Sequence, residues 1–335
     1  GGGGSRPHGR SRPFRSLFVA VTRSGSMSLS VTFLGTGGAV PSVQRNTSSV
    51  LVRRGGDRLM FDCGEGTQRQ LMRYGAGFGI SQLFVTHLHG DHVLGIPGLV
   101  QSMEFNDREA PLAIHVPGGR SRAMHELLDG TSSRPSFPVR INEVTPGTAA
   151  TRAAEYEVRA FETDHRTASV GYALVEDERK GRFDRDRAEE LGVPAGPLFS
   201  KLHAGNAIEL EDGTRVESAE VVGPARPGRR LVYTGDTRPT EATATSAAEA
   251  DLLIHDATFG DDHEERAAAT GHATARAAGR IASRAAVRRL ALTHVSSRYG
   301  DQVSHLEREA REVFDGELFV PADGDSLEIP LRDGR

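Results

Sequence analysis

The sequence predicts an α/β domain in which loops at one edge of the strands build a metal site. Short apolar runs alternate with stretches of helical periodicity, including an alanine-rich stretch at about 271–283. Four apolar runs end in polar residues, and these ends carry His87, Asp236, His255 and His294. Loops at one sheet edge commonly form the active site of an α/β protein. One pattern therefore predicts both the fold class and the place of the site.

The most informative stretch is His87-Leu88-His89-Gly90-Asp91-His92, which follows an apolar run at 83–85. An apolar run that ends in a polar, glycine-containing turn indicates a buried strand followed by a loop. His87 and His89 are two residues apart and can point the same way from extended backbone, while Gly90 lets the chain turn toward Asp91 and His92. Three imidazoles and a carboxylate at one strand end predict a metal site that can hold two ions.

Strands are expected where apolar or alternating runs are bounded by turn residues. These runs are 30–34, 48–52, 58–61, 83–85, 112–116, 140–144, 156–161, 169–174, 229–234, 250–254 and 290–293. Helical spacing predicts helices at 93–105 and about 271–283. The glycine-rich turn at 35–38 is not a dinucleotide-binding fingerprint, because its glycine spacing is wrong and no helical pattern follows.

Composition separates residues 1–26 from the rest of the chain. They are glycine-rich at the start and contain five arginines and no acidic residue, so we interpret them as a disordered extension of a catalytic domain at 27–335. Removing these five charges takes the formal net charge from −4 to −9. The single Cys63 excludes an internal disulfide and a Cys-rich zinc site. No stretch approaches the roughly 18 consecutive apolar residues of a membrane span. We therefore expect a cytoplasmic protein.

The stretch at 86–92 resembles the metal-binding signature of the metallo-β-lactamase superfamily and, more narrowly, that of the ribonuclease Z family. The segment at 61–71, with Asp62 at a strand end, is similar to the segment that precedes this signature in the family. Asp62 is expected either to brace a metal ligand through a hydrogen bond or to cap a helix. The resemblance spans roughly residues 29–330. It implies a four-layer αββα sandwich with a protruding substrate-binding arm.

The resemblance also implies two metal ions, expected to be zinc, with manganese or another divalent metal as the alternative. One ion would be bound by His87, His89 and His165, and the other by Asp91, His92 and His294. Asp236 would bridge the two ions. Imidazole and carboxylate are ligands that catalytic zinc sites use.

Acid–base roles follow from the resemblance in the same way. Asp91 would double as the proton acceptor for the attacking water. His272 would give a proton to the departing oxygen, oriented by an acidic partner. That partner is usually glutamate in the family, and here it is Asp256, whose side chain is one methylene shorter. His255 is expected to be structural.

Substrate contacts are expected from two loops and a long excursion. The loop at 41–46 resembles the family's P-x-K-x-R-N loop, with Val43 in the place of the lysine. Arg45 and Asn46 are predicted to contact phosphate or base edges, unless this loop is an ordinary turn. Arg298 is a further candidate near the site. The charged segment at about 176–205 contains Gly196-Pro197 and resembles the arm that grips the tRNA body, the alternative being a solvated loop.

The implied activity is that of a zinc-dependent hydrolase, an endoribonuclease that removes the 3′ trailer of precursor tRNA. Metal-activated water would attack the phosphodiester and leave a 3′-hydroxyl on the tRNA and a 5′-phosphate on the trailer. The family also implies a homodimer. One alternative is another dinuclear-metal hydrolase or phosphodiesterase of this fold with a small substrate, which would require neither the arm nor His272. A non-catalytic, metal-stabilised RNA-binding module is the other, and the full ligand set argues against it.

Overall fold

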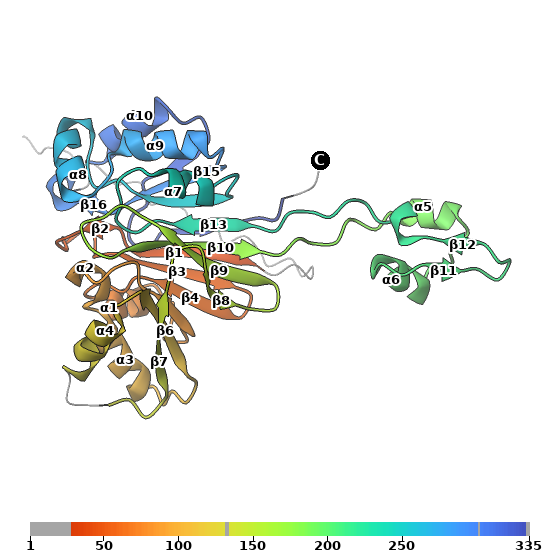
Figure 1. Cartoon of the computed structure of the whole chain (residues 1–335), viewed down its shortest axis with the longest axis horizontal. Helices are drawn as coiled ribbons and strands as arrows, with labels where there is room; N and C mark the ends of the chain where they lie inside the picture. Colours follow the sequence, from red (N-terminus) through yellow and green to blue (C-terminus); the bar gives the residue numbers. More distant parts are fainter. Residues whose placement is uncertain (1–27, 131–133, 301, 333–335) are drawn as a thin grey trace, which may run out of the picture.

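The computed structural model describes residues 28–130, 134–300 and 302–332, so the predicted extension at 1–26 lies outside the described residues. Two seven-stranded sheets pack face to face, and helices cover the outer side of each (Figure 1). The predicted αββα sandwich is therefore confirmed. Every predicted strand overlaps a strand of the structure.

The first sheet has the order β18-β1-β3-β4-β5-β6-β7, with antiparallel pairing around β1 and parallel pairing from β4 to β7. Its strands are β1 (Leu29–Gly35), β3 (Ser49–Arg54), β4 (Asp57–Phe61), β5 (Gln82–Phe84), β6 (Leu112–Pro117), β7 (Val139–Val144) and β18 (Ser326–Glu328). The helices on its side are α1 (Thr67–Arg73), α2 (Gly90–Val93), α3 (Ile96–Phe105) and α4 (Ser121–Asp129). Because β4 to β7 are parallel, their carboxyl ends meet at one edge.

The second sheet has the order β17-β15-β14-β13-β10-β9-β8. Its strands are β8 (Ala149–Arg152), β9 (Tyr156–Glu162), β10 (Val170–Glu176), β13 (Arg230–Tyr233), β14 (Leu252–Asp256), β15 (Arg289–Thr293) and β17 (Glu317–Phe319). The helical elements on its side are α7 (Glu241–Ser246), η2 (Asp261–His263), α8 (Glu264–Thr270), α9 (Ala275–Arg284), η3 (Ser297–Tyr299) and α10 (Ser304–Arg311). The short strands β2 (Gly37–Gly38) and β16 (Val295–Ser296) pair in parallel, which joins a loop of each half.

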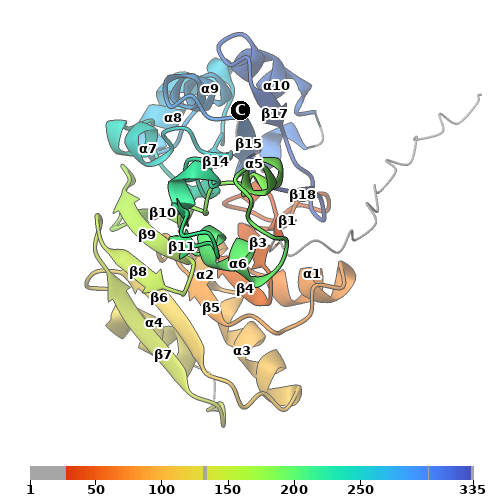
Figure 2. The same cartoon turned by 90° about the vertical axis from the view of Figure 1, so that its right-hand side faces the viewer.

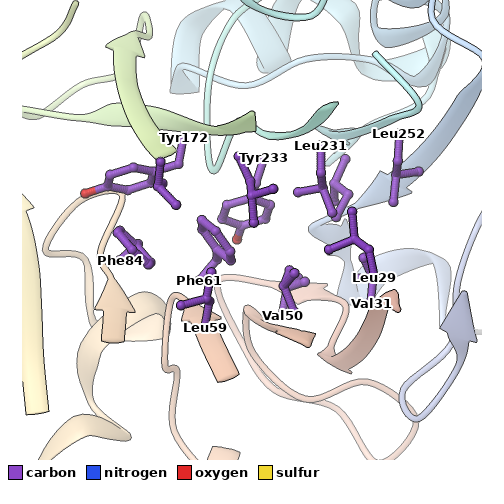
Figure 3. Close-up of a cluster of buried hydrophobic side chains, with 14 of the residues drawn as sticks. Leu29, Val31, Val50, Leu59, Phe61, Phe84, Tyr172, Leu231, Tyr233 and Leu252 are labelled. Atoms are coloured by element: carbon purple, nitrogen blue, oxygen red, sulfur yellow. The ribbon is translucent and has the colours of Figure 1, made fainter. Parts of the chain in front are cut away.

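The core between the sheets is apolar and aromatic (Figure 3). Phe61 and Phe84 of the first sheet stack with their ring centroids 5.1 Å apart, and Tyr172 of the second sheet meets Phe84 edge-on at 5.3 Å. Buried tyrosines also need hydrogen-bond acceptors. Tyr172 donates to the carbonyl of Val85, and Tyr233 donates to Asp62, both at the start of the metal loops. The core therefore fixes the position of those loops.

An arm leaves the sandwich between β10 and β13 and projects far from it (Figure 1); Figure 2 looks onto its tip. Its elements are α5 (Arg185–Glu190), α6 (Pro197–His203), β11 (Ile208–Glu209), β12 (Arg215–Val216) and η1 (Ser218–Glu220). The arm spans residues 177–228 and is longer than the predicted 176–205. The reason is its own apolar cluster, in which Ala188 and Leu202 pack with Val216 from beyond residue 205.

Candidate metal centre

The seven predicted ligand residues converge at the sheet edge where the loops after β5, β13 and β15 meet the loop before β10. Around one oxygen of Asp236, Nε2 of His87 lies 3.6 Å and Nε2 of His165 lies 4.0 Å from Oδ2. Around its other oxygen, Nε2 of His92 and of His294 lie 3.3 and 3.2 Å from Oδ1. Asp236 is thus the residue common to both ligand groups, as a bridging carboxylate would be.

The first group consists of His87, His89, His165 and Asp236. Nδ1 of His89 lies 3.0 Å from Nε2 of His87 and 3.2 Å from Nε2 of His165, so three ring nitrogens face one another. Burial lowers the pKa of all three histidines, and that of His87 well below its usual value. Neutral imidazole is the form that binds metal. This group therefore fits a cation.

The second group consists of Asp91, His92, Asp236 and His294. Nε2 of His92 and Oδ1 of Asp236 are buried and have no hydrogen-bond partner within the described residues. An unsatisfied buried polar atom costs about 1 to 3 kcal/mol, and more when charged. A cation between these two atoms would satisfy both, so the second group also fits a metal ion.

Each inward-facing Nε2 is prepared by a hydrogen bond at the opposite ring nitrogen. Nδ1 of His165 donates to the carbonyl of Gly271 at 2.7 Å, and Nδ1 of His294 lies 2.7 Å from Oγ1 of Thr258. Nδ1 of His87 lies 3.1 Å from Oγ1 of Thr86. Such bonds fix the ring orientation and the tautomer of a metal-binding histidine.

Asp62 fixes the ring orientation and the tautomer of His92 through a hydrogen bond at Nδ1. Its Oδ2 accepts bonds from Nδ1 of His92 at 2.7 Å and from the Tyr233 hydroxyl at 2.8 Å, and its Oδ1 accepts from the Thr86 backbone N–H at 2.8 Å. The interpretation of Asp62 as a brace is confirmed, because the N-cap of α1 is Gly66 and no side chain caps that helix.

Asp91 lies at the mouth of the second group. Its Oδ2 accepts a bond from the Ala39 backbone N–H at 2.8 Å and lies 3.2 Å from Nε2 of His294. Burial would raise the pKa of Asp91, but its hydrogen bond with His294 and the nearby ring of His92 hold the pKa well below the usual range. The carboxylate is therefore ionised. Gly38 permits this close packing, since a Cβ there would lie 2.5 Å from Nδ1 of His294.

His272 and Asp256 form a separate pair beside the ligand cluster. Nδ1 of His272 donates to Oδ2 of Asp256 at 2.8 Å, and Oδ1 of Asp256 accepts from the backbone and hydroxyl of Thr258 at 2.8 and 2.7 Å. Burial would lower the pKa of His272, but Asp256 raises it to about 9. Asp256 thus favours the protonated form of this imidazole at the cavity wall. His255 is buried and bonds to the carbonyl of Asp256.

A cavity of about 350 Å³ opens above the cluster. Its lining residues are Ala39, His89, Asp91, His165, Arg166, Asp236, Thr270, His272 and His294. The cavity therefore gives a substrate access to both ligand groups and to His272. Arg166 is a lining residue that the sequence interpretation missed, although an arginine directly after a predicted ligand histidine was a visible signal.

Two of the predicted substrate contacts make hydrogen bonds within the protein. Arg45 is only 6% exposed, and its Nη1 donates to Oγ1 of Thr36 and to the carbonyl of Pro321, each at 2.7 Å. Nδ2 of Asn46 donates to the Glu65 carbonyl at 2.8 Å, and the Asn46 backbone N–H donates to Asp323 at 2.6 Å. Both residues hold their loop against other segments, and Arg45 is too buried to meet a substrate in this conformation, while a contact from Asn46 stays a prediction.

The other predicted substrate contacts lie in accessible places. Arg298 is exposed, with Nη1 3.0 Å from Nε2 of His263 and its guanidinium 5.6 Å from the Phe259 ring centroid. Gly196 and Pro197 are exposed on the arm, where Gly196 adopts a φ of 147° immediately before α6. Their contact with substrate stays a prediction.

Comparisons with known proteins show which family models and which relatives this chain matches. A family model described as Anti-Pycsar protein Apyc1 matches residues 29–180, and one described as Beta-lactamase superfamily domain matches residues 203–295. The ribonuclease Z of Natronomonas pharaonis is 62% identical over 92% of this chain and 100% of its own length. That of Haloferax volcanii is 62% identical over 92% of this chain and 97% of its own.

The chain also aligns with solved structures over most of its length. The short form of human tRNase Z aligns with a TM-score of 0.65 and 27% identity, over 90% of this chain and 100% of that one. YhfI of Bacillus subtilis, a metallo-beta-lactamase fold protein, aligns with a TM-score of 0.66 and 21% identity over 90% of this chain and 99% of that one, and shows the fold alone. Within the described residues, helices are too short or too polar to cross a membrane.

Proposed function

The chain belongs to the ribonuclease Z family, and from that premise we propose that its His/Asp cluster binds two zinc ions and cleaves precursor tRNA there. It is a hydrolytic endoribonuclease of tRNA 3′ processing. The observation that supports the two-ion site best is Asp236, whose two oxygens each face a separate group of histidine nitrogens.

His87, His89 and His165 would hold one ion, and Asp91, His92 and His294 the other, with Asp236 shared. Imidazole with carboxylate suits zinc, while manganese is the alternative because it accepts the two carboxylates as ligands. When bound, the two ions would lower the pKa of a water molecule and stabilise charge that develops on the phosphate.

The chain's own groups would move the protons. Asp91, an ionised carboxylate at the cavity, would accept the proton of the attacking water. His272 would donate a proton to the departing 3′-oxygen, because Asp256 holds its imidazole in the protonated form. The products would be a tRNA with a 3′-hydroxyl and a trailer with a 5′-phosphate.

The arm would grip the tRNA body, and its position supports a homodimer. The stems of the arm join the ends of β10 and β13 that lie away from the metal loops, and a strand of seven residues spans roughly 20 Å. Figure 1 shows the arm on the side opposite α2 and β16. A second copy could place its arm beside this site. Light scattering should then give twice the chain mass of 36.0 kDa.

We place this activity in the cytoplasm, because precursor tRNA is an intracellular RNA.

Incubation with a 3′-extended precursor tRNA tests the function directly. We expect one cut at the end of the tRNA body, lost with a chelator and restored by zinc. His89→Ala should abolish it, and His125→Ala, an exposed histidine on α4, is the matched control. A chelator-insensitive cut would contradict the metal assignment. Hydrolysis of bis-p-nitrophenyl phosphate without any cut in precursor tRNA would favour the small-substrate hydrolase.

A further inference from the structure

Arg166 lies at the wall of the metal cavity with an exposed side chain. Of the nine described residues that line this cavity, it is the one with a permanent positive charge. Other lining groups include the carboxylates of Asp91 and Asp236. An RNA backbone that enters this cavity is repelled by these carboxylates, and among the lining residues only Arg166 carries a fixed positive charge that can offset them. Arg166 is therefore placed where a phosphate needs a partner.

The guanidinium of Arg166 is also uncommitted. Within the described residues it has no hydrogen bond or ion pair. Arg238, a neighbouring arginine, is bound instead to Asp164 at 2.8 Å and to the carbonyl of Ala268 at 2.7 Å. The guanidinium of Arg238 is therefore used in bonds within the protein, whereas that of Arg166 can bind a phosphate.

The stem of Arg166 is held against the loop that carries His272. A Cβ placed on Gly271 would lie 3.2 Å from Cγ of Arg166 and 2.9 Å from Nδ1 of His165. Gly271 has a φ of 83°, which favours glycine, so both the backbone and the space require it. This packing sets Arg166 on the His272 side of the cavity.

We propose that Arg166 binds the RNA phosphate on the tRNA side of the scissile bond, one nucleotide before the cut. The inference rests on the proposed function, in which His272 protonates the 3′-oxygen of the tRNA. A group on the His272 side then faces the tRNA end and not the trailer. The planar guanidinium offers paired donors that match two phosphate oxygens. Because the buried ligands form the floor and Arg166 is exposed, it contacts the neighbouring phosphate and not the scissile one.

Processed tRNA without a trailer is the decisive probe, because it keeps this phosphate and cannot be cleaved. Its dissociation constant should be measured by filter binding to the metal-loaded protein at several salt concentrations. Arg166→Ala should weaken binding roughly tenfold, and should lower the slope of log affinity against log salt by about 0.7 to 0.9. Arg166→Lys should keep the slope and lose part of the affinity. Arg280→Ala, an exposed arginine on α9, is the matched control.

Three results would overturn the inference. Unchanged binding of processed tRNA with a raised KM for the precursor would move the contact to the trailer side. An unchanged salt slope would mean that Arg166 contacts no phosphate. A loss of metal in both the Ala and the Lys variants would mean that Arg166 acts by supporting His165. If the wild-type protein does not cut precursor tRNA, the proposed function fails first, and that result is separate from these three.

Discussion

Replacing Asp62 by asparagine should weaken metal binding through the tautomer of His92. Oδ2 of Asp62 accepts bonds from Nδ1 of His92 and from the Tyr233 hydroxyl, at 2.7 and 2.8 Å. The Thr86 N–H fixes the amide oxygen of an asparagine at the Oδ1 position. An NH₂ group then faces His92 and cannot accept its Nδ1–H. The imidazole must carry its proton on Nε2, the atom that faces Asp236, and a protonated nitrogen cannot bind metal.

Loss of a hydrogen-bond partner behind a metal ligand typically costs 10- to 100-fold in metal affinity, which is about 1.4 to 2.8 kcal/mol. The backbone should not add to this cost, because Asp62 has a φ of 56° and asparagine tolerates that region well. The free energy of unfolding should fall by about 1 to 3 kcal/mol, since a buried acceptor with several donors is lost.

Zinc content after equilibrium dialysis against a competing chelator measures the effect. Asp57→Asn is the matched control, because this carboxylate also accepts a tyrosine hydroxyl, that of Tyr156 at 2.9 Å, but lies at the start of β4. Circular dichroism should show both variants folded. A folded Asp62→Asn protein that retains the zinc affinity of the wild type would show that the bond between Asp62 and His92 does not set the metal affinity.

Three further predictions concern catalysis, the arm and pH. His272→Ala should lower the single-turnover cleavage rate about 10²- to 10⁴-fold with zinc content unchanged, and Asp256→Asn should lower it less; loss of zinc would make His272 a ligand instead. A short Gly-Ser linker in place of 177–228 should abolish precursor processing, while hydrolysis of bis-p-nitrophenyl phosphate falls far less, because remote binding energy helps only substrates that have the remote parts. An equal loss of both activities would contradict the view that the arm only binds tRNA. Burial would raise the pKa of Glu176, but Arg229 lowers it. Its stabilising effect is therefore complete above the unfolded pKa of about 4.3 and is lost as the pH falls through the lower folded value. Thermal unfolding of Glu176→Gln should depend less on pH below about 4.3, and an identical pH profile would count against this ion pair.

The sequence could predict the ligand cluster because each ligand sits at the end of an apolar run. Parallel strands bring their carboxyl ends to one edge of a sheet, so Asp236 after β13 and His294 after β15 lie at the same edge of the second sheet. The packing of the two sheets, which no strand pattern reports, brings them to His87 after β5 of the first sheet. The bridging place of Asp236 came from the family resemblance and not from any spacing. The brace provided by Asp62 was open between two interpretations until its distance to His92 was known.

Elements that depend on distant pairing were harder to predict. Strand β18 pairs with β1, as in Thr32 with Ser326, and no local pattern in a three-residue strand reports a partner so far away. Helix α4 buries only Met124 and α10 buries only Leu306 and Ala310, so each carries too few apolar positions for a clear helical stripe. Their packing is tertiary and does not appear in local periodicity.

Arg45 shows the same limit at the level of one side chain. Its motif suggested a phosphate contact, yet its Nη1 donates to the carbonyl of Pro321, which is 276 residues further along the chain. Asp323 in the same segment accepts bonds from the backbone N–H groups of Thr36 and Asn46. A motif can report which residue types occupy a loop, but the chain that returns to cover the loop decides which of them meet solvent.

The charges of the arm suggest how an acidic protein holds RNA. On α5, Arg185 pairs with Glu189 at 2.8 Å and Arg187 is paired in the same way, so these arginines contribute little net field. Lys180 and Lys201, the two lysines of the chain, are exposed on the arm and have no ion pair within the described residues. Free cations on the arm and a metal-loaded cavity would then supply attraction for phosphate in a chain whose formal net charge is −4. We propose that a folded tRNA that reaches both places at once is bound more tightly than an unstructured RNA that reaches only one of them.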